Sequence, residues 1–121
     1  MWTYEQESGN LETSDGTRVG KGYSGCGTGL NNPALEHLAD VGPIPRGDYR
    51  IGRFFDDTGG KGPLVAHIWP CADTNEFGRS GFMIHGDNQA CDHTASHGCI
   101  ILAHSIREQI VASSDRLLKV V

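Results

Sequence analysis

The chain has 121 residues, a formal net charge of −5 and 37% hydrophobic residues. A chain of this length buries roughly two thirds of its unfolded surface, which is enough for one core, so we expect residues 1–121 to form a single domain. The negative charge, with no cluster of Lys and Arg, argues against nucleic acid as a partner and against a polybasic membrane anchor, because both depend on neutralising phosphates.

Seventeen glycines and five prolines divide the chain into short segments, which is typical of β-strands separated by turns. The expected strands are residues 2–4, 17–19, 47–52, 63–69, 82–85, 99–102 and 117–121. A short helix is expected near residues 33–38, and a longer one begins at Ser105, which forms a capping-box pattern with Glu108. These elements predict a mainly β fold, an antiparallel β-sandwich or barrel with one or two short helices.

A histidine and a cysteine lie at the edges of two of these strands. A cysteine with an ordinary pKa of about 8.5 is only a few per cent thiolate at neutral pH, and a neighbouring imidazole raises that fraction. If strands 82–85 and 99–102 are antiparallel neighbours, His85 lies beside Cys99, and alternation places Met83 and His85 on the face opposite Ile84. Gly98 allows a sharp turn, so that nearby amide groups can face an oxyanion.

A histidine and a cysteine at this separation are, taken alone, more often core residues than a catalytic pair. The contiguous Ser96-His97-Gly98-Cys99 favours the catalytic interpretation. This order, with His85 upstream, resembles the L,D-transpeptidase (YkuD-like) family, whose signature is a histidine, a spacer and then Ser/Thr-His-Gly-Cys. Further segments resemble one branch of that superfamily, the small peptidoglycan-targeting toxins delivered by type VI secretion: residues 2–4, 22–25, 29–33, 41–49, 77–82 and 85–87.

The resemblance implies a catalytic domain of L,D-transpeptidase type that acts on the tetrapeptide stems of peptidoglycan without a cofactor. In that family the cysteine attacks the carbonyl of meso-diaminopimelate, expels the terminal D-alanine and forms a thioacyl-enzyme. Water then gives L,D-carboxypeptidase activity, a D-amino acid gives exchange, and a second stem gives a crosslink.

The resemblance also implies a place of action and partners. Residues 1–7 have neither the basic nor the apolar region of a signal peptide, which leaves the cytoplasm or export by another machine. A type VI effector is made in the cytoplasm, leaves through a secretion apparatus and acts in the periplasm of a target bacterium. We therefore expect a cognate immunity protein as a partner, and neither nucleic acid nor membrane insertion.

Carried onto this chain, the resemblance makes Cys99 the nucleophile and His85 the general base. Gly86 is expected to orient the imidazole through its carbonyl, in place of a triad acid. His97 and Gly98 are expected to shape the oxyanion site, although an ordered loop histidine without a catalytic role is the alternative for His97.

Substrate recognition is expected to depart from the family pattern, because many members carry an arginine two positions after the cysteine and this chain has Ile101 there. Arg79 and Arg46 are candidates for binding a stem carboxylate, and a solvated surface arginine is the alternative for both. Tyr23 and Asn32 are expected to border the cleft, although turn formation explains Asn32 equally well. The candidate substrate-binding residues are Ser96, Arg79, Tyr23, Asn32 and Asp87.

The cysteines permit two other interpretations. Cys91, His93, His97 and Cys99 offer four zinc ligands, which would make this segment a zinc-stapled binding element, although ligand pairs with one intervening residue strain a tetrahedron. Cys26, Cys71 and Cys91 are either small packing residues or contain one disulfide, and an oxidising periplasm favours the disulfide. The glycines at positions 25, 27 and 29 lack the spacing of a nucleotide-binding loop and predict a flexible loop.

Overall fold

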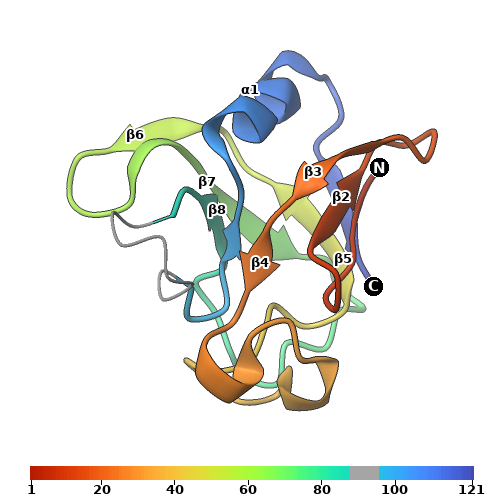
Figure 1. Cartoon of the computed structure of the whole chain (residues 1–121), viewed down its shortest axis with the longest axis vertical. Helices are drawn as coiled ribbons and strands as arrows, with labels where there is room; N and C mark the ends of the chain where they lie inside the picture. The colour runs from red at the N-terminus through yellow and green to blue at the C-terminus, as the bar shows by residue number, and fades with distance from the viewer. Residues whose placement is uncertain (88–95) are drawn as a thin grey trace.

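A computed structural model describes residues 1–87 and 96–121 of the chain. Within them the secondary structure is mainly β, with the α-helix α1 (His104–Ala112) and the 3-10 helices η1 (Gly27–Gly29) and η2 (Pro33–Leu35) (Figure 1). The strands are β1 (Trp2–Tyr4), β2 (Asn10–Glu12), β3 (Arg18–Lys21), β4 (Tyr23–Ser24), β5 (Gly47–Ile51), β6 (Phe55–Asp57), β7 (Gly62–Pro70), β8 (Met83–His85), β9 (Ile100–Ile101) and β10 (Leu117–Val120). The mainly β class predicted from the sequence is confirmed.

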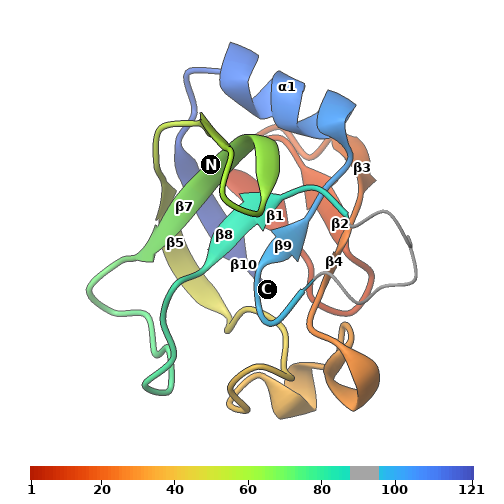
Figure 2. The same cartoon turned by 90° about the vertical axis from the view of Figure 1, so that its left-hand side faces the viewer.

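The strands form one sheet whose two edges are joined by the chain itself. The strand order is β3-β2-β1-β10-β5-β7-β8-β9-β4, and β6 pairs with β7 off this path. Because β3 ends at Lys21 and β4 begins at Tyr23, only Gly22 separates the first strand of the sheet from the last. The sheet therefore curves round into a closed, barrel-like shape (Figure 2).

The sheet is mixed, whereas the sequence predicted an antiparallel one. Most neighbours are antiparallel, but β1 pairs with β10 and β8 pairs with β9 in parallel. Parallel neighbours need a crossover of about a dozen residues or more, and residues 86–99 supply a connection of that length between β8 and β9. Strand alternation alone does not report the direction of a neighbour, so the pattern of residues 82–85 and 99–102 was compatible with either.

Some elements were missed or misplaced. Strands β2, β4 and β6 were not predicted, because they are two or three residues long and lack a run of alternating apolar side chains. The capping box is wrong: Ala103 is the N-cap of α1, no side chain caps it, and Ser105 lies inside the helix. The expected helix near residues 33–38 is the short η2, capped by the side chain of Asn32.

Alternation along the central strands separates a core face from an outer face. Ala66 and Ile68 of β7, Ile84 of β8 and Ile100 of β9 belong to one hydrophobic core. The residues between them lie on the opposite, outer face of the sheet: His67 and Trp69 on β7, Met83 and His85 on β8, and Ile101 on β9. Trp69 is exposed there, whereas Met83, His85 and Ile101 are buried.

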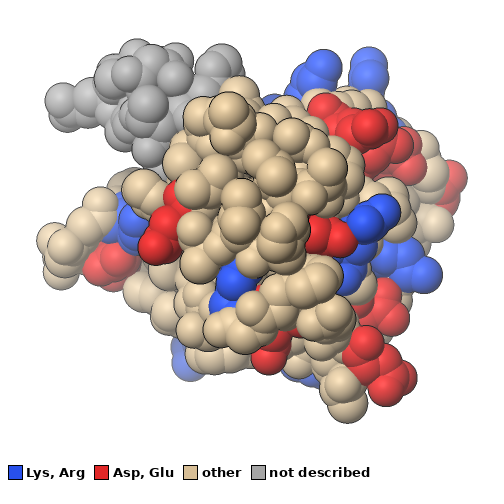
Figure 3. Space-filling view, turned by 90° about the horizontal axis from the view of Figure 1, so that it is seen from below, with Lys and Arg blue, Asp and Glu red and all other residues tan. Residues whose placement is uncertain are grey.

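Helix α1 covers one end of the barrel, with Ile106 and Ile110 packed into the core (Figures 1 and 2). Figure 3 shows the opposite end, where uncharged surface is surrounded by side chains of both charges. No helix in the described part of the chain is long and apolar enough to cross a membrane.

Closure of the sheet predicts that Gly22→Ala destabilises the fold. A Cβ at position 22 would meet the carbonyl oxygen of Ile101 and would lie 2.7 Å from Leu102 Cδ2, so strand β4 would have to move away from β9. We expect Gly22→Ala to lower the free energy of unfolding by about 2 kcal/mol, measured by urea denaturation. Gly60→Ala is the matched control, because a Cβ there meets nothing within 4 Å; equal stabilities of the two variants would contradict the closure.

Candidate active site

His85 lies at the end of β8 and is held by the backbone of the next residue. Its side chain is only 2% exposed, and its Nδ1 lies 2.8 Å from the carbonyl oxygen of Gly86. A carbonyl oxygen only accepts hydrogen bonds, so Nδ1 carries the proton and Nε2 carries the lone pair. Nε2 is buried without a hydrogen-bond partner among the described residues. Such an atom is rare in a folded protein and is suited to accept a proton from an incoming group.

Cys99 lies directly before β9 and shares the outer face with His85. The register pairs Ile84 with Ile100 and His85 with Ile101. The residue before Ile100 therefore lies beside Met83, and alternation turns the Cys99 side chain to the side of Met83 and His85. The sequence predicted these two strands to be antiparallel, and this is wrong; the parallel register nevertheless makes His85 and Cys99 diagonal neighbours, about 7–8 Å apart at Cα.

Burial shifts both groups toward their neutral forms. It raises the pKa of the Cys99 thiol, and a backbone hydrogen bond from Met83 only partly offsets this. Burial lowers the pKa of His85, with the Gly86 hydrogen bond acting in the opposite direction. At neutral pH the resting site therefore holds a thiol and a neutral imidazole, and the proton moves when sulfur attacks.

Ser96 fixes the turn that precedes Cys99. Its hydroxyl accepts hydrogen bonds from the amides of Gly25 (2.9 Å) and Gly98 (3.1 Å) and donates one to the carbonyl oxygen of Cys99 (2.6 Å). Ser96 is fully buried, so it holds the loop as expected but does not face a substrate. The amide of Gly98 is engaged by Ser96, which corrects the expectation that it faces an oxyanion.

Arg79 holds loops together instead of binding a carboxylate. It is 7% exposed, and its guanidinium donates to the carbonyl oxygens of Glu36, Gly42, Pro43 and His97 while lying 5.3 Å from the ring centroid of Phe82. The alternative of a solvated surface arginine is wrong for Arg79. Backbone carbonyls surround the guanidinium, and they carry no signal in the sequence.

Gly98 is in contact with this arginine. Its φ is +124°, in the region that favours glycine, and a Cβ there would run into Arg79 Nη2. The expected role of Gly98 in the oxyanion site therefore becomes a role in backbone conformation. His97 is exposed, and its Nδ1 lies 3.3 Å from the carbonyl oxygen of Asp40.

Two further candidates for substrate binding are engaged elsewhere. Asn32 Oδ1 accepts from the amide of Ala34, and its Nδ2 donates to the carbonyl oxygen of Thr28, so the turn-forming alternative is the correct one. The guanidinium of Arg46 pairs with Glu36, with Nη2 2.7 Å from Oε2.

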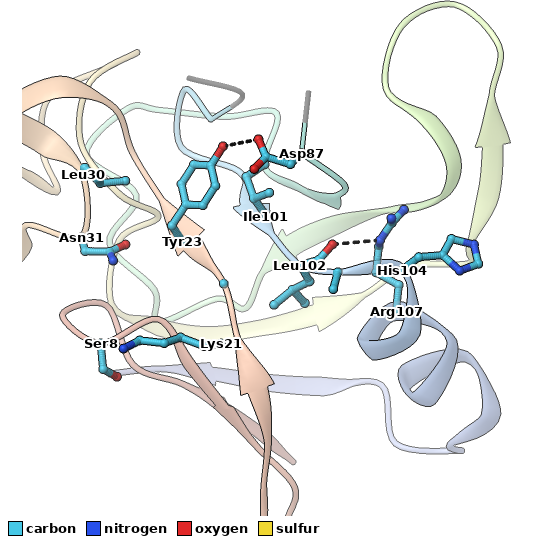
Figure 4. A pocket seen from close by; sticks show the side chains of 12 residues that line it. Ser8, Lys21, Tyr23, Leu30, Asn31, Asp87, Ile101, Leu102, His104 and Arg107 are labelled. Atoms are coloured by element: carbon cyan, nitrogen blue, oxygen red, sulfur yellow. Dashed lines mark hydrogen bonds between the residues drawn. The ribbon is translucent and has the colours of Figure 1, made fainter. Parts of the chain in front are cut away.

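Tyr23 and Asp87 line a cavity of about 630 Å³ beside strand β9 (Figure 4). The Tyr23 hydroxyl donates to Asp87 Oδ1 at 2.8 Å, so Asp87 is bound to a tyrosine and is not the acid of a triad. Ile101, which is in register with both Tyr23 and His85, forms part of the wall. The remaining lining residues are Ser8, Lys21, Gly22, Leu30, Asn31, Leu102, Ala103, His104 and Arg107.

Arg107 of helix α1 lies between this cavity and the backbone beside His85. Its Nε donates to the carbonyl oxygen of Leu102, and Nη1 donates to those of Pro63 and Leu64. A Cβ on Gly86 would lie 2.6 Å from Arg107 Nη2, so the guanidinium occupies the space beside the residue that orients His85. Sequence reasoning missed Arg107 and Lys21, since no motif marks them.

The disulfide and zinc interpretations of the cysteines lie partly within the described residues. Cys26, Cys71 and Cys99 carry free thiols, so Cys26 and Cys71 are not joined by a disulfide. Cys91 and His93 lie outside the described residues, and with them two of the four proposed zinc ligands. In the described part of the chain no three potential ligands gather around a metal position.

The fold and the site define a small, mainly β domain that presents a buried histidine and a free thiol on neighbouring strands. A family model, described as the Tlde1 domain, matches residues 18–120, and the chain therefore belongs to the Tlde1 domain family. This is a family of type VI secretion effectors, so the chain is an effector toxin with a secretion apparatus and a cognate immunity protein as partners. No curated protein matches the chain.

The backbone role of Arg79 predicts that Arg79→Met destabilises the protein. The substitution leaves carbonyl oxygens of residues 36, 42 and 43 without their donor, and we expect a loss of about 2–4 kcal/mol in the free energy of unfolding by urea denaturation. The exposed Arg18→Met is the control. A variant of unchanged stability with only a higher KM would show instead that Arg79 binds substrate.

The electrostatics predict slow alkylation of Cys99 near neutral pH. Because burial raises the pKa of the thiol, the reactive thiolate becomes dominant only above the ordinary range of about 8.5. We expect the rate of iodoacetamide modification, followed for Cys99 by peptide mass, to keep rising as the pH passes 8.5. If the modification rate instead reached half of its maximum below pH 7, the resting site would hold a thiolate–imidazolium pair, and the neutral site would be contradicted.

Proposed function

We propose that this effector is a cysteine-dependent peptidoglycan-modifying enzyme of L,D-transpeptidase type. It acts on tetrapeptide stems through a thioacyl-enzyme, removing the terminal D-alanine or exchanging it for another D-amino acid, in the periplasm of a target bacterium. The observation that carries the proposal is the state of His85: Nδ1 is bound to Gly86, and Nε2 is buried without a partner in residues 1–87 and 96–121, on the face shared with Cys99.

The first half of the reaction follows from this arrangement. As Cys99 Sγ attacks the carbonyl carbon of the third stem residue, Nε2 of His85 accepts the thiol proton. The tetrahedral intermediate then collapses, the C–N bond to D-alanine breaks, and the imidazolium returns the proton to the leaving amine. The Gly86 carbonyl stabilises the imidazolium through Nδ1–H, which replaces the acid of a triad.

The second half returns the enzyme to its starting state. Water or the amine of a D-amino acid attacks the thioester, His85 Nε2 takes a proton from this nucleophile, and the proton passes to the departing Cys99 sulfur. Since Ser96 engages the amide of Gly98, we propose the amide of Cys99 as the backbone donor to the oxyanion. Gly98 and Arg79 contribute by fixing the conformation of the loop that presents this amide.

The substrate is proposed to run along the outer face. The cavity beside Ile101 offers Lys21, Asn31 and the Tyr23–Asp87 pair, and it suits the polar groups of diaminopimelate and of the stem terminus. The immunity protein is proposed to act by covering the face over Cys99.

We predict that Cys99→Ala abolishes activity and that His85→Ala lowers it by about 10²–10⁴-fold, because the thiol loses its base. The test is incubation with tetrapeptide muropeptides, with and without a free D-amino acid, and identification of the products by mass. Cys71→Ala is the control, since Cys71 lies directly after β7 and away from the catalytic pair.

Two outcomes would contradict the proposal. Tetrapeptides that stay intact in both conditions, while another bond is cut, would exclude the reaction. Stoichiometric zinc, with activity lost to a chelator and retained after alkylation, would favour the zinc-stapled alternative built on Cys91, His93, His97 and Cys99.

A further inference from the structure

Three aromatic rings are stacked on the outer face of the sheet. His67 lies between Phe55 and Trp69, with ring centroids 5.5 Å and 5.3 Å apart and interplanar angles of 24° and 28°. Phe55 is 39% exposed and Trp69 is 56% exposed, whereas Trp2, the other tryptophan of the chain, is 4% exposed. The stack, which we call the aromatic platform, leaves a large apolar surface in water, and exposed aromatic surface of this kind is typical of binding sites.

The aromatic platform belongs to the same face as the catalytic pair. His67 is in register with Met83 across β7 and β8, and Cys99 lies on the other side of Met83. His67, Met83 and Cys99 therefore form one row across three strands, all turned outward. Strand β7 pairs with β6 and with β8, whereas β9 and β4, beside the cavity of Figure 4, follow on the other side of β8. The platform therefore lies on the side of the candidate pair that is away from this cavity.

The surroundings of Trp69 suit a neutral ligand with polar groups at its edge. Arg50, which is exposed, is in register with Trp69 on β5, and the indole nitrogen lies against Gly52, 3.3 Å from where a Cβ would be. Aromatic faces carry partial negative charge and attract polarised C–H groups, which a pyranose ring presents on its flat side. Guanidinium and imidazole groups at the rim can bond to hydroxyl and acetamido groups.

The spacing matches the proposed substrate. Strands lie about 4.8 Å apart, so two strand spacings place His67 about 10 Å from Cys99, and Trp69 lies one side-chain repeat further along β7. The carbonyl attacked by Cys99 belongs to the third stem residue. Three residues of at most about 3.6 Å each connect the lactyl link to that carbonyl, so the sugar can lie about 10 Å from Cys99 without full extension of the stem.

We propose that Phe55, His67 and Trp69 hold the saccharide from which the stem peptide extends. The inference rests on the proposed function and adds a glycan subsite to it: the sugar packs on the aromatic platform, the third stem residue lies over Cys99, and the stem terminus points toward the cavity lined by Tyr23 and Asp87. The enzyme then prefers stems that are still attached to glycan over free peptides.

The test compares kcat/KM for a disaccharide-tetrapeptide and for the free tetrapeptide. We expect the wild type to prefer the disaccharide substrate by about fivefold to tenfold, the size of one aromatic stacking contact, mainly through KM. Trp69→Ala should bring the ratio close to one. Phe77→Ala is the matched control, because Phe77 is 42% exposed and its ring contacts His37 and not the platform. A ratio that is one in the wild type, or unchanged in Trp69→Ala, would overturn the proposal.

A binding measurement separates this inference from the proposed reaction. In the Cys99→Ala protein, titration with the peptide-free disaccharide should change the fluorescence of exposed Trp69, and the change should be lost in Cys99→Ala/Trp69→Phe. This result supports the glycan subsite even if no tetrapeptide is processed, in which case only the proposed reaction fails. If the disaccharide has no effect while raising the protein concentration changes the fluorescence, the platform is a contact between copies and the saccharide proposal is wrong.

Discussion

The parallel pairing of β8 with β9 is the constraint on which the candidate site depends. This pairing places His85 beside Ile101 and, two residues earlier on each strand, Met83 beside Cys99. The histidine and the cysteine therefore lie on one face as diagonal neighbours. The neighbouring strands continue this register on both sides. Met83 pairs with His67 of β7, and Ile101 pairs with Tyr23 of β4. A slip of one residue would move Cys99 into the core, because strand side chains alternate between faces. Gly22 limits such a slip, since β4 is packed against β9 and is continuous with β3.

Two buried arginines hold the backbone on either side of this pair. Arg79 ties the carbonyls of residues 36, 42 and 43 to that of His97, and Arg107 ties α1 to the carbonyls of residues 63, 64 and 102. Burying a guanidinium is costly unless most of its donors are satisfied, and carbonyl oxygens satisfy them here without a carboxylate. Each guanidinium lies where a side chain would be on a glycine next to the candidate pair, Arg79 at Gly98 and Arg107 at Gly86. The glycines and the arginines therefore form a single packing arrangement around His85 and Cys99.

The sequence predicted those features of the site that depend on neighbouring residues. It did not predict features that depend on backbone groups far away in the chain. The Ser96-His97-Gly98-Cys99 motif and the outward direction of His85 follow from neighbouring residues and from alternation, and the Gly86 carbonyl is where the resemblance placed it. Strand direction is different, because the apolar pattern of residues 82–85 is the same beside a parallel or an antiparallel neighbour. The partners of Arg79 are carbonyls 18 to 43 positions away, which any residue supplies, so nothing in the sequence distinguished it from a substrate-binding arginine. Strand β6, with two aspartates in three residues, forms because β7 supplies its hydrogen bonds.

The face that carries Cys99 also bears on the rate of the proposed reaction, because the thiol there is half-buried and neutral. Burial keeps Cys99 protonated and His85 neutral, which limits the reaction of the thiol with small electrophiles and with oxidants. Productive attack then depends on a substrate that is held long enough, and at the right depth, for proton transfer to coincide with attack. In the proposed mechanism, the aromatic platform toward β7 and the cavity toward β4 would fix such a substrate at two points, one on each side of the thiol. Binding energy gathered away from the reacting carbonyl would thus offset the low thiolate fraction at the nucleophile.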